Sequence, residues 1–71
     1  MGDVAEQSKA IIDRGWFFEV EELTTGEASL TVFDPESQVD IAIEVVPNGP
    51  EVVSAVDRLV SISYNVLMEI K

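Results

Sequence analysis

The first part of the chain changes from a helical spacing of apolar residues to a strand spacing. Over residues 3–14 the apolar positions recur at intervals of three and four, which predicts a short amphipathic helix. Asp3 stands three residues before Glu6, as in a capping box, and predicts the helix start. Gly15 occupies the position of a glycine that ends a helix with a positive φ. The side of this helix expected to face the core comprises Val4, Ala5, Ser8, Ile11 and Ile12.

From Trp16 onward apolar and polar residues alternate, which predicts strands with one buried face. Two turns divide this stretch into three strands, because Gly26 supplies a positive φ and Pro35 presets the φ of a turn. The residues expected to face the core are Trp16, Phe18, Val20, Ala28, Leu30, Val32, Val39, Ile41, Ile43 and Val45. The residues expected to face away from it are Phe17, Glu19, Glu21, Ser29, Thr31, Phe33, Asp40, Ala42 and Glu44.

A second, longer helix is predicted from Pro50 to the region of Lys71. Asn48 or Gly49 is suited to cap it, and Glu51 complements the helix dipole in the first turn. Its buried stripe is expected to comprise Val52, Val53, Val56, Leu59, Val60, Val66, Leu67 and Ile70. Its polar side is expected to comprise Ser54, Asp57, Arg58, Ser61, Asn65 and Glu69.

The order helix–strand–strand–strand–helix predicts a single α+β domain over residues 1–71. Short turns between the strands favour an antiparallel meander. Since only one face of each strand is apolar, both helices should cover the same face in a two-layer sandwich. The other face of the three-stranded sheet is then left to water.

Charge and composition exclude several classes of function. The 71 residues include 14 acidic and 4 basic side chains with no histidine and no cysteine, for a net charge of −10 at pH 7. Without histidine and cysteine, most zinc sites and most nucleophile–base pairs are impossible, so we expect no enzyme, no metal and no cofactor. Such an acidic surface repels phosphate, so we expect no direct binding of nucleic acid.

The sequence also predicts a cytoplasmic protein with no membrane partner. No apolar run approaches the roughly 18 residues that a membrane span needs. Residues 1–6 lack the basic start and the apolar centre of a secretory signal.

The uncovered sheet face combines carboxylates with two phenyl rings. Its candidate partner-binding residues are Phe17, Glu19, Glu21, Phe33, Asp40 and Glu44. Carboxylates attract a basic partner and rings supply anchors that lose their water on binding, so the face is predicted to dock on a basic protein surface. The alternative is a solvated face whose acidity serves solubility or adaptation to high salt.

The second helix carries apolar residues beyond its main stripe. Ile62, Tyr64 and Met68 widen its apolar arc to roughly half of the circumference. They are candidate contacts of a homodimer, which is a usual way for a domain this small to gain stability. A small accessory or structural domain that dimerises through this helix is therefore the alternative function.

The predicted element order is similar to that of double-stranded-RNA-binding domains, over nearly the whole chain but in topology only. That family binds RNA through a basic cluster at the start of its second helix, where residues 48–53 here contain no lysine or arginine. The resemblance therefore implies a fold without RNA binding. The step Arg14-Gly15-Trp16 resembles mRNA interferase toxins, but the strand histidine on which their activity rests is absent.

In size, acidity and lack of catalytic residues, the chain resembles phage-encoded inhibitors, including anti-CRISPR proteins that occupy the nucleic-acid site of an effector. This resemblance implies a non-enzymatic nucleic-acid mimic whose partner is a nucleic-acid-binding protein or complex. An immunity protein or antitoxin against a basic nuclease would use the same charge complementarity.

Overall fold

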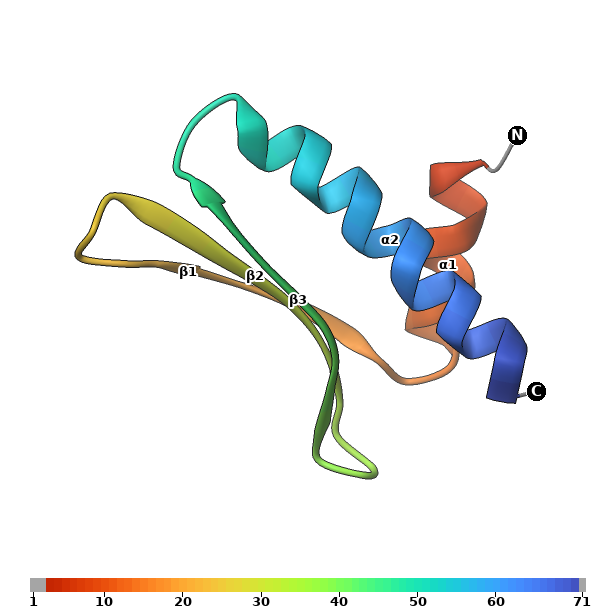
Figure 1. Cartoon of the computed structure of the whole chain (residues 1–71). Helices are drawn as coiled ribbons and strands as arrows, with labels where there is room; N and C mark the ends of the chain where they lie inside the picture. Colours follow the sequence, from red (N-terminus) through yellow and green to blue (C-terminus); the bar gives the residue numbers. More distant parts are fainter. Residues whose placement is uncertain (1–2, 71) are drawn as a thin grey trace.

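Two helices pack on one face of a three-stranded sheet in the computed structural model, which describes residues 3–70. The elements are α1 (Val4–Asp13), β1 (Phe17–Glu22), β2 (Glu27–Asp34), β3 (Val39–Pro47) and α2 (Glu51–Ile70). The strands are antiparallel in the order β1-β2-β3. Figure 1 shows α1 and α2 on the same side of the sheet, so the predicted α+β sandwich is confirmed. Met1, Gly2 and Lys71, the predicted end of the second helix, lie outside the described residues.

The start of α1 follows the predicted capping pattern in part. Asp3 accepts a hydrogen bond from the backbone N–H of Ala5 at 2.9 Å, which satisfies one free donor of the first turn. Glu6 makes no reciprocal bond among the described residues, so only half of the capping box forms. Of the predicted apolar side, Ile11 is buried, Ser8 is half-buried, and Val4, Ala5 and Ile12 are exposed.

The end of α1 brings Trp16 into the core. The N–H groups of Gly15 and Trp16 donate to the carbonyls of Ile12 and Ile11 at 2.9 and 3.2 Å, and Gly15 has φ 98°. This is the Schellman arrangement, which needs a residue that tolerates positive φ. The chain reverses here and buries Trp16 to 1% exposure just before β1, rather than as the first strand residue.

The core lies between the helices and the middle strand. Its buried apolar members are Ile11, Trp16, Ala28, Leu30, Val32, Val46, Ala55, Leu59, Val60 and Leu67. The core face of β2 is fully covered, since its three apolar residues are each at most 1% exposed. Their predicted orientation is therefore confirmed.

The buried side of α2 differs from the predicted stripe at both of its ends. Val53 and Ile70 are exposed, because the sheet and α1 cover only the middle of the helix. Two small residues outside the predicted stripe, Ala55 and Ser63, are buried instead. The hydroxyl of Ser63 has no hydrogen-bond partner among the described residues, and neither has the indole N–H of Trp16.

The orientation predicted for most of β3 is wrong because the strand contains a β-bulge. Val32 pairs with Ala42 but the next residue of β2, Phe33, pairs with Asp40, so Ile41 is an extra residue. One extra residue sends every following side chain to the opposite face. Ala42, Glu44 and Val46 therefore face the helices, and Ile43 and Val45 face away from them. Val39, before the bulge, keeps its predicted face, and Ile41 packs against the core in part.

Glu44 is accommodated on the helix side of the sheet by an ion pair with α2. The Nε of Arg58 donates to Glu44 Oε1 at 2.7 Å, and a second guanidinium nitrogen contacts the same oxygen. The Glu44 side chain is 23% exposed, so the charge is compensated without being fully desolvated. This pair links α2 to the edge strand β3.

The turn between β2 and β3 is organised around Asp34. Asp34 accepts hydrogen bonds from the N–H of Glu36 and from the hydroxyl of Ser37, each at 2.9 Å. Burial alone would raise the pKa of Asp34, but these hydrogen bonds and the nearby charge of Arg14 lower it below its ordinary value. The turn also places Gln38 in the left-handed region, at φ 59°, which the sequence did not predict.

We expect Asp34→Asn to lower the thermal midpoint at neutral pH by a few degrees. A lowered folded-state pKa means that the ionised carboxylate stabilises the fold above the ordinary pKa. This contribution is lost as the pH falls through the lowered folded-state pKa, so variant and wild type should converge at acidic pH, below the ordinary pKa of an aspartate. Thermal unfolding followed by circular dichroism from neutral to acidic pH measures the difference. Glu36→Gln is the matched control, and an equal loss in that exposed neighbour would contradict the role of Asp34.

Candidate functional site

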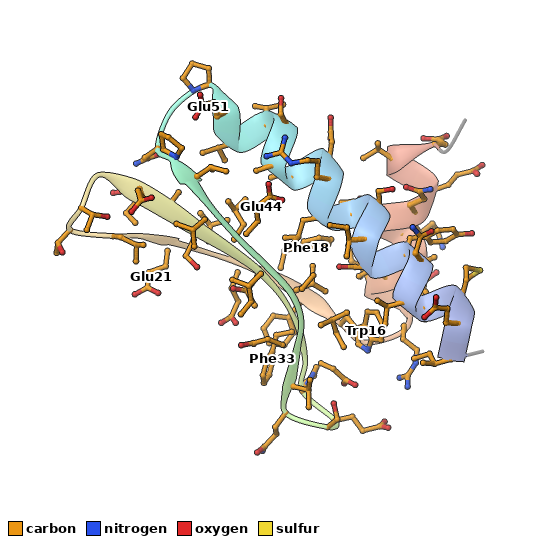
Figure 2. The ribbon with its side chains drawn as sticks, viewed as in Figure 1. Trp16, Phe18, Glu21, Phe33, Glu44 and Glu51 are labelled. Atoms are coloured by element: carbon orange, nitrogen blue, oxygen red, sulfur yellow. The ribbon has the colours of Figure 1, made fainter. Side chains whose placement is uncertain are left out.

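The sheet has one face that neither helix covers. Figure 2 shows Glu21 and Phe33 on this side of the sheet, whereas Trp16, Phe18 and Glu44 lie on the helix side. The face, called the open face below, comprises Phe17, Glu19, Glu21, Ser29, Thr31, Phe33, Asp40, Ile43 and Val45.

The strand register sorts the residues of the open face by chemistry. It forms three rows across the sheet: Phe17–Phe33–Asp40, Glu19–Thr31–Ile43 and Glu21–Ser29–Val45. Directly opposed residues on antiparallel strands lie on the same face and are close neighbours. The rows therefore place two carboxylates on β1, small hydroxyl residues on β2 and two aliphatic residues on β3. The rings occupy the end of the face nearest the turn between β2 and β3.

The two rings of the open face contact each other edge to face. Their centroids lie 5.4 Å apart at an interplanar angle of 60°. This geometry is favourable for aromatic pairs and fixes both rings. Phe17 remains 42% exposed and Phe33 is half-buried, so the pair still presents apolar surface to a partner.

Among residues 3–70, no positive charge offsets the carboxylates of the open face. The three strands contain no lysine or arginine. Among the described cations, Lys9 pairs with Asp13 at 2.8 Å, and that hydrogen bond and charge raise the pKa of Lys9. Arg14 lies over the Trp16 ring, 5.9 Å from its centroid, and Arg58 pairs with Glu44. Every described cation is thus engaged on the helix side of the molecule.

The structure brings together five of the six predicted partner-binding residues. Phe17, Glu19, Glu21, Phe33 and Asp40 share the open face. Glu44 does not, because the bulge at Ile41 turns it toward α2 and Arg58. Ile43 and Val45 take its place on the face at 57% and 48% exposure. The sequence-based prediction failed here because Val45 and Val46 are adjacent and equally apolar, so either could point inward. No residue type in the strand indicated a bulge.

The candidate dimer contacts on α2 do not form one surface. Ile62 and Met68 are 49% and 41% exposed, whereas Tyr64 is half-buried and packs against the core. Six positions along a helix correspond to about 120° of rotation, so Ile62 and Met68 point in different directions. Ile62 and Met68 therefore do not belong to one apolar stripe on the described part of α2.

The described residues contain no group of three or more acidic side chains placed to hold a metal ion. A hollow of about 360 Å³ lies between the C-terminal parts of the helices, lined by Ala10, Asp13, Arg14 and Leu67. Its two charged residues are Asp13, which pairs with Lys9, and Arg14, which lies over the Trp16 ring, so both have structural roles. Within residues 3–70, no helix has the combined length and hydrophobicity needed to cross a bilayer.

Comparison with known proteins leaves the open face as the main guide to function. No family model, curated protein or solved structure matches the chain. The geometry and charge of the open face are the features of the molecule that indicate a function.

Proposed function

We propose that this chain is a non-enzymatic binding protein that docks its open face on a basic protein surface. The observation that carries the proposal is the row pattern of that face, with uncompensated carboxylates on β1, aliphatic residues on β3 and a ring pair at one end. A partner would match it with lysine or arginine beside an apolar patch. A second copy of this chain is a poor match, since it brings a net charge of −10 of its own.

The partner is proposed to be a protein or complex that handles nucleic acid. A basic surface with apolar patches is typical of sites that bind phosphates and stack bases. A small acidic protein that occupies such a site would exclude nucleic acid from it. The chain would then act as a phage-type inhibitor, in the manner of anti-CRISPR proteins, or as an immunity protein against a basic nuclease.

We expect Glu19→Lys with Glu21→Lys to abolish most of the capture of basic proteins by the immobilised chain. Charge reversal turns attraction into repulsion at the point of contact and slows association. The experiment captures proteins from a bacterial lysate and identifies them by mass spectrometry, at about 0.05 M and about 0.5 M salt, because screening should release a complex steered by charge. A short DNA duplex or single-stranded RNA, added as competitor, should displace the same proteins.

The matched control is Asp57→Lys with Glu69→Lys on the exposed polar side of α2. It changes the net charge by the same amount but leaves the open face intact. The control should retain capture of the basic proteins. Equal loss in both double variants would mean that only the overall charge matters. Capture that is indifferent to the reversal, to salt and to the competitors would contradict the proposed function.

A further inference from the structure

The two edges of the sheet differ in how well they are protected. The edge strand β3 contains the bulge at Ile41, ends in Pro47 and is tied to α2 through Glu44 and Arg58. Bulges, proline and a covering helix are the usual devices that prevent an edge from pairing with another strand. The edge strand β1 has neither a bulge nor a proline, and neither helix packs extensively against it in the described structure.

The register identifies which backbone groups of β1 are free. The N–H of Leu23 donates to the carbonyl of Glu27 at 2.8 Å, so this pair belongs to the hydrogen-bonded class. Hydrogen-bonded and non-hydrogen-bonded pairs alternate along an antiparallel ladder. The N–H and C=O groups of Phe18, Val20 and Glu22 therefore point away from β2, toward the open edge. Together they form a row of donors and acceptors for one additional strand.

The helix-side surface of β1 is also uncovered. Val20 faces the same side as its register partner Leu30, yet Val20 is 62% exposed and Leu30 is 1% exposed. The difference arises because the helices pack mainly against β2 and β3, and neither packs extensively against β1. In Figure 1 the hairpin formed by β1 and β2 projects away from the helices. An added strand that placed an apolar side chain beside Val20 would extend the core outward.

The charges of β1 select the sequence of such a strand. Glu19 and Glu21 lie on the open face and Glu22 on the helix side, with no lysine or arginine in β1. Pairing with β1 of a second copy would oppose carboxylate to carboxylate, which is unfavourable between neighbouring strands. A strand that alternates basic and apolar residues would instead place cations beside Glu19 and Glu21, and apolar side chains beside Phe18 and Val20.

We propose that β1 takes up an extended segment of alternating basic and apolar residues, which adds a fourth strand to the sheet. Main-chain hydrogen bonds supply affinity in this mode of recognition, and alternate side chains supply specificity. The inference rests on the proposed function, since it specifies how part of the basic partner would meet the acidic side of the open face. Strand addition differs from docking on the open face because it requires the free backbone groups of β1 as well as its carboxylates.

The test uses a blocked hexapeptide that alternates lysine and valine, which matches the six residues of β1. Titration into the isotopically labelled chain, followed by amide NMR, should shift the resonances of β1 and protect the amides of Phe18, Val20 and Glu22 from exchange. The peptide that alternates glutamate and valine is the charge control and should not bind. No binding of the lysine peptide up to about 1 mM would overturn the inference.

Val20→Pro isolates the contribution of the edge. Proline is tolerated on an edge strand where its missing N–H would have faced solvent, so the bonds between β1 and β2 should survive. We expect Val20→Pro to weaken peptide binding at least about tenfold more than Val20→Ala, which retains the N–H. Circular dichroism checks that both variants fold. If Val20→Pro does not fold, two peptides N-methylated at alternate residues provide the same test, one methylated at odd-numbered and the other at even-numbered residues. In one of these two registers the methyl groups replace the N–H groups that would bond to β1. That peptide should not bind the wild-type chain.

The outcomes separate this inference from the proposed function. One outcome is that peptide binding is lost on Glu19→Lys with Glu21→Lys but is unaffected by Val20→Pro and by N-methylation in either register. This outcome overturns strand addition and leaves docking on the open face. Binding that requires both the carboxylates and the edge N–H supports strand addition. Capture of basic proteins by the Val20→Pro variant at wild-type level would likewise show docking without strand addition.

Discussion

Replacement of Trp16 by alanine is expected to leave much of the protein unfolded at 25 °C. Trp16 is the largest of the fully buried side chains, at 1% exposure. Truncating a buried tryptophan costs about 3–5 kcal/mol, which is close to the whole stability of a domain this small. Loss of the helical circular dichroism signal and of a cooperative thermal transition would report it.

Two further variants define what the Trp16 result means. Trp16→Phe keeps most of the ring volume and removes the indole N–H that has no partner, so it should cost much less than alanine. Val20→Ala removes an aliphatic side chain that is 62% exposed and should change stability little. A Trp16→Ala protein that melts within a few degrees of wild type would contradict the placement of Trp16 in the core.

The second large effect is expected on binding, from Phe17→Ala combined with Phe33→Ala. The two rings form the apolar anchor at one end of the open face. Aromatic anchors that lose their water on binding commonly contribute about 2 kcal/mol or more, so affinity for the captured basic partner should fall by about 30-fold or more. Calorimetry or biosensor measurements on purified components would measure the loss, after thermal unfolding has confirmed that the double variant is folded.

The matched control for the rings is Ile62→Ala combined with Met68→Ala. These residues are exposed apolar side chains on α2, away from the open face, and were the candidate dimer contacts. Their removal should leave affinity for the basic partner unchanged. A loss in this control that equals the loss in the ring variant would shift the binding surface to α2 and favour the accessory-domain alternative.

Local signals in the sequence predicted most of the fold. Asp3 and Gly15 mark the ends of α1, and Gly26, at φ 89°, marks the first hairpin turn. Strict alternation from Ala28 to Phe33 predicted both faces of β2 correctly, because the middle strand is covered by helices along its whole length. These features depend on backbone preferences and on alternation within one element, so no tertiary information was needed.

Two features of the site depended on contacts that the sequence does not encode locally. The bulge at Ile41 reverses the later part of β3, and the inward position of Glu44 is stabilised by Arg58, fourteen residues further along the chain. The exposure of Val20 follows from where the helices cross the sheet, although its alternation is that of a buried residue. Both corrections make the open face and the edge of β1 more apolar than the sequence predicted.

NMR mapping of where the captured basic partner contacts this chain tests docking through the open face most directly. Docking through the open face should give the largest perturbations of amide and side-chain signals at Phe17, Glu19, Phe33 and Ile43. These perturbations should disappear at about 0.5 M salt as the charges are screened. Signals of the polar side of α2, at Asp57 and Glu69, should remain unchanged. Perturbations centred on α2, or a complex that is equally stable at high salt, would contradict docking through the open face.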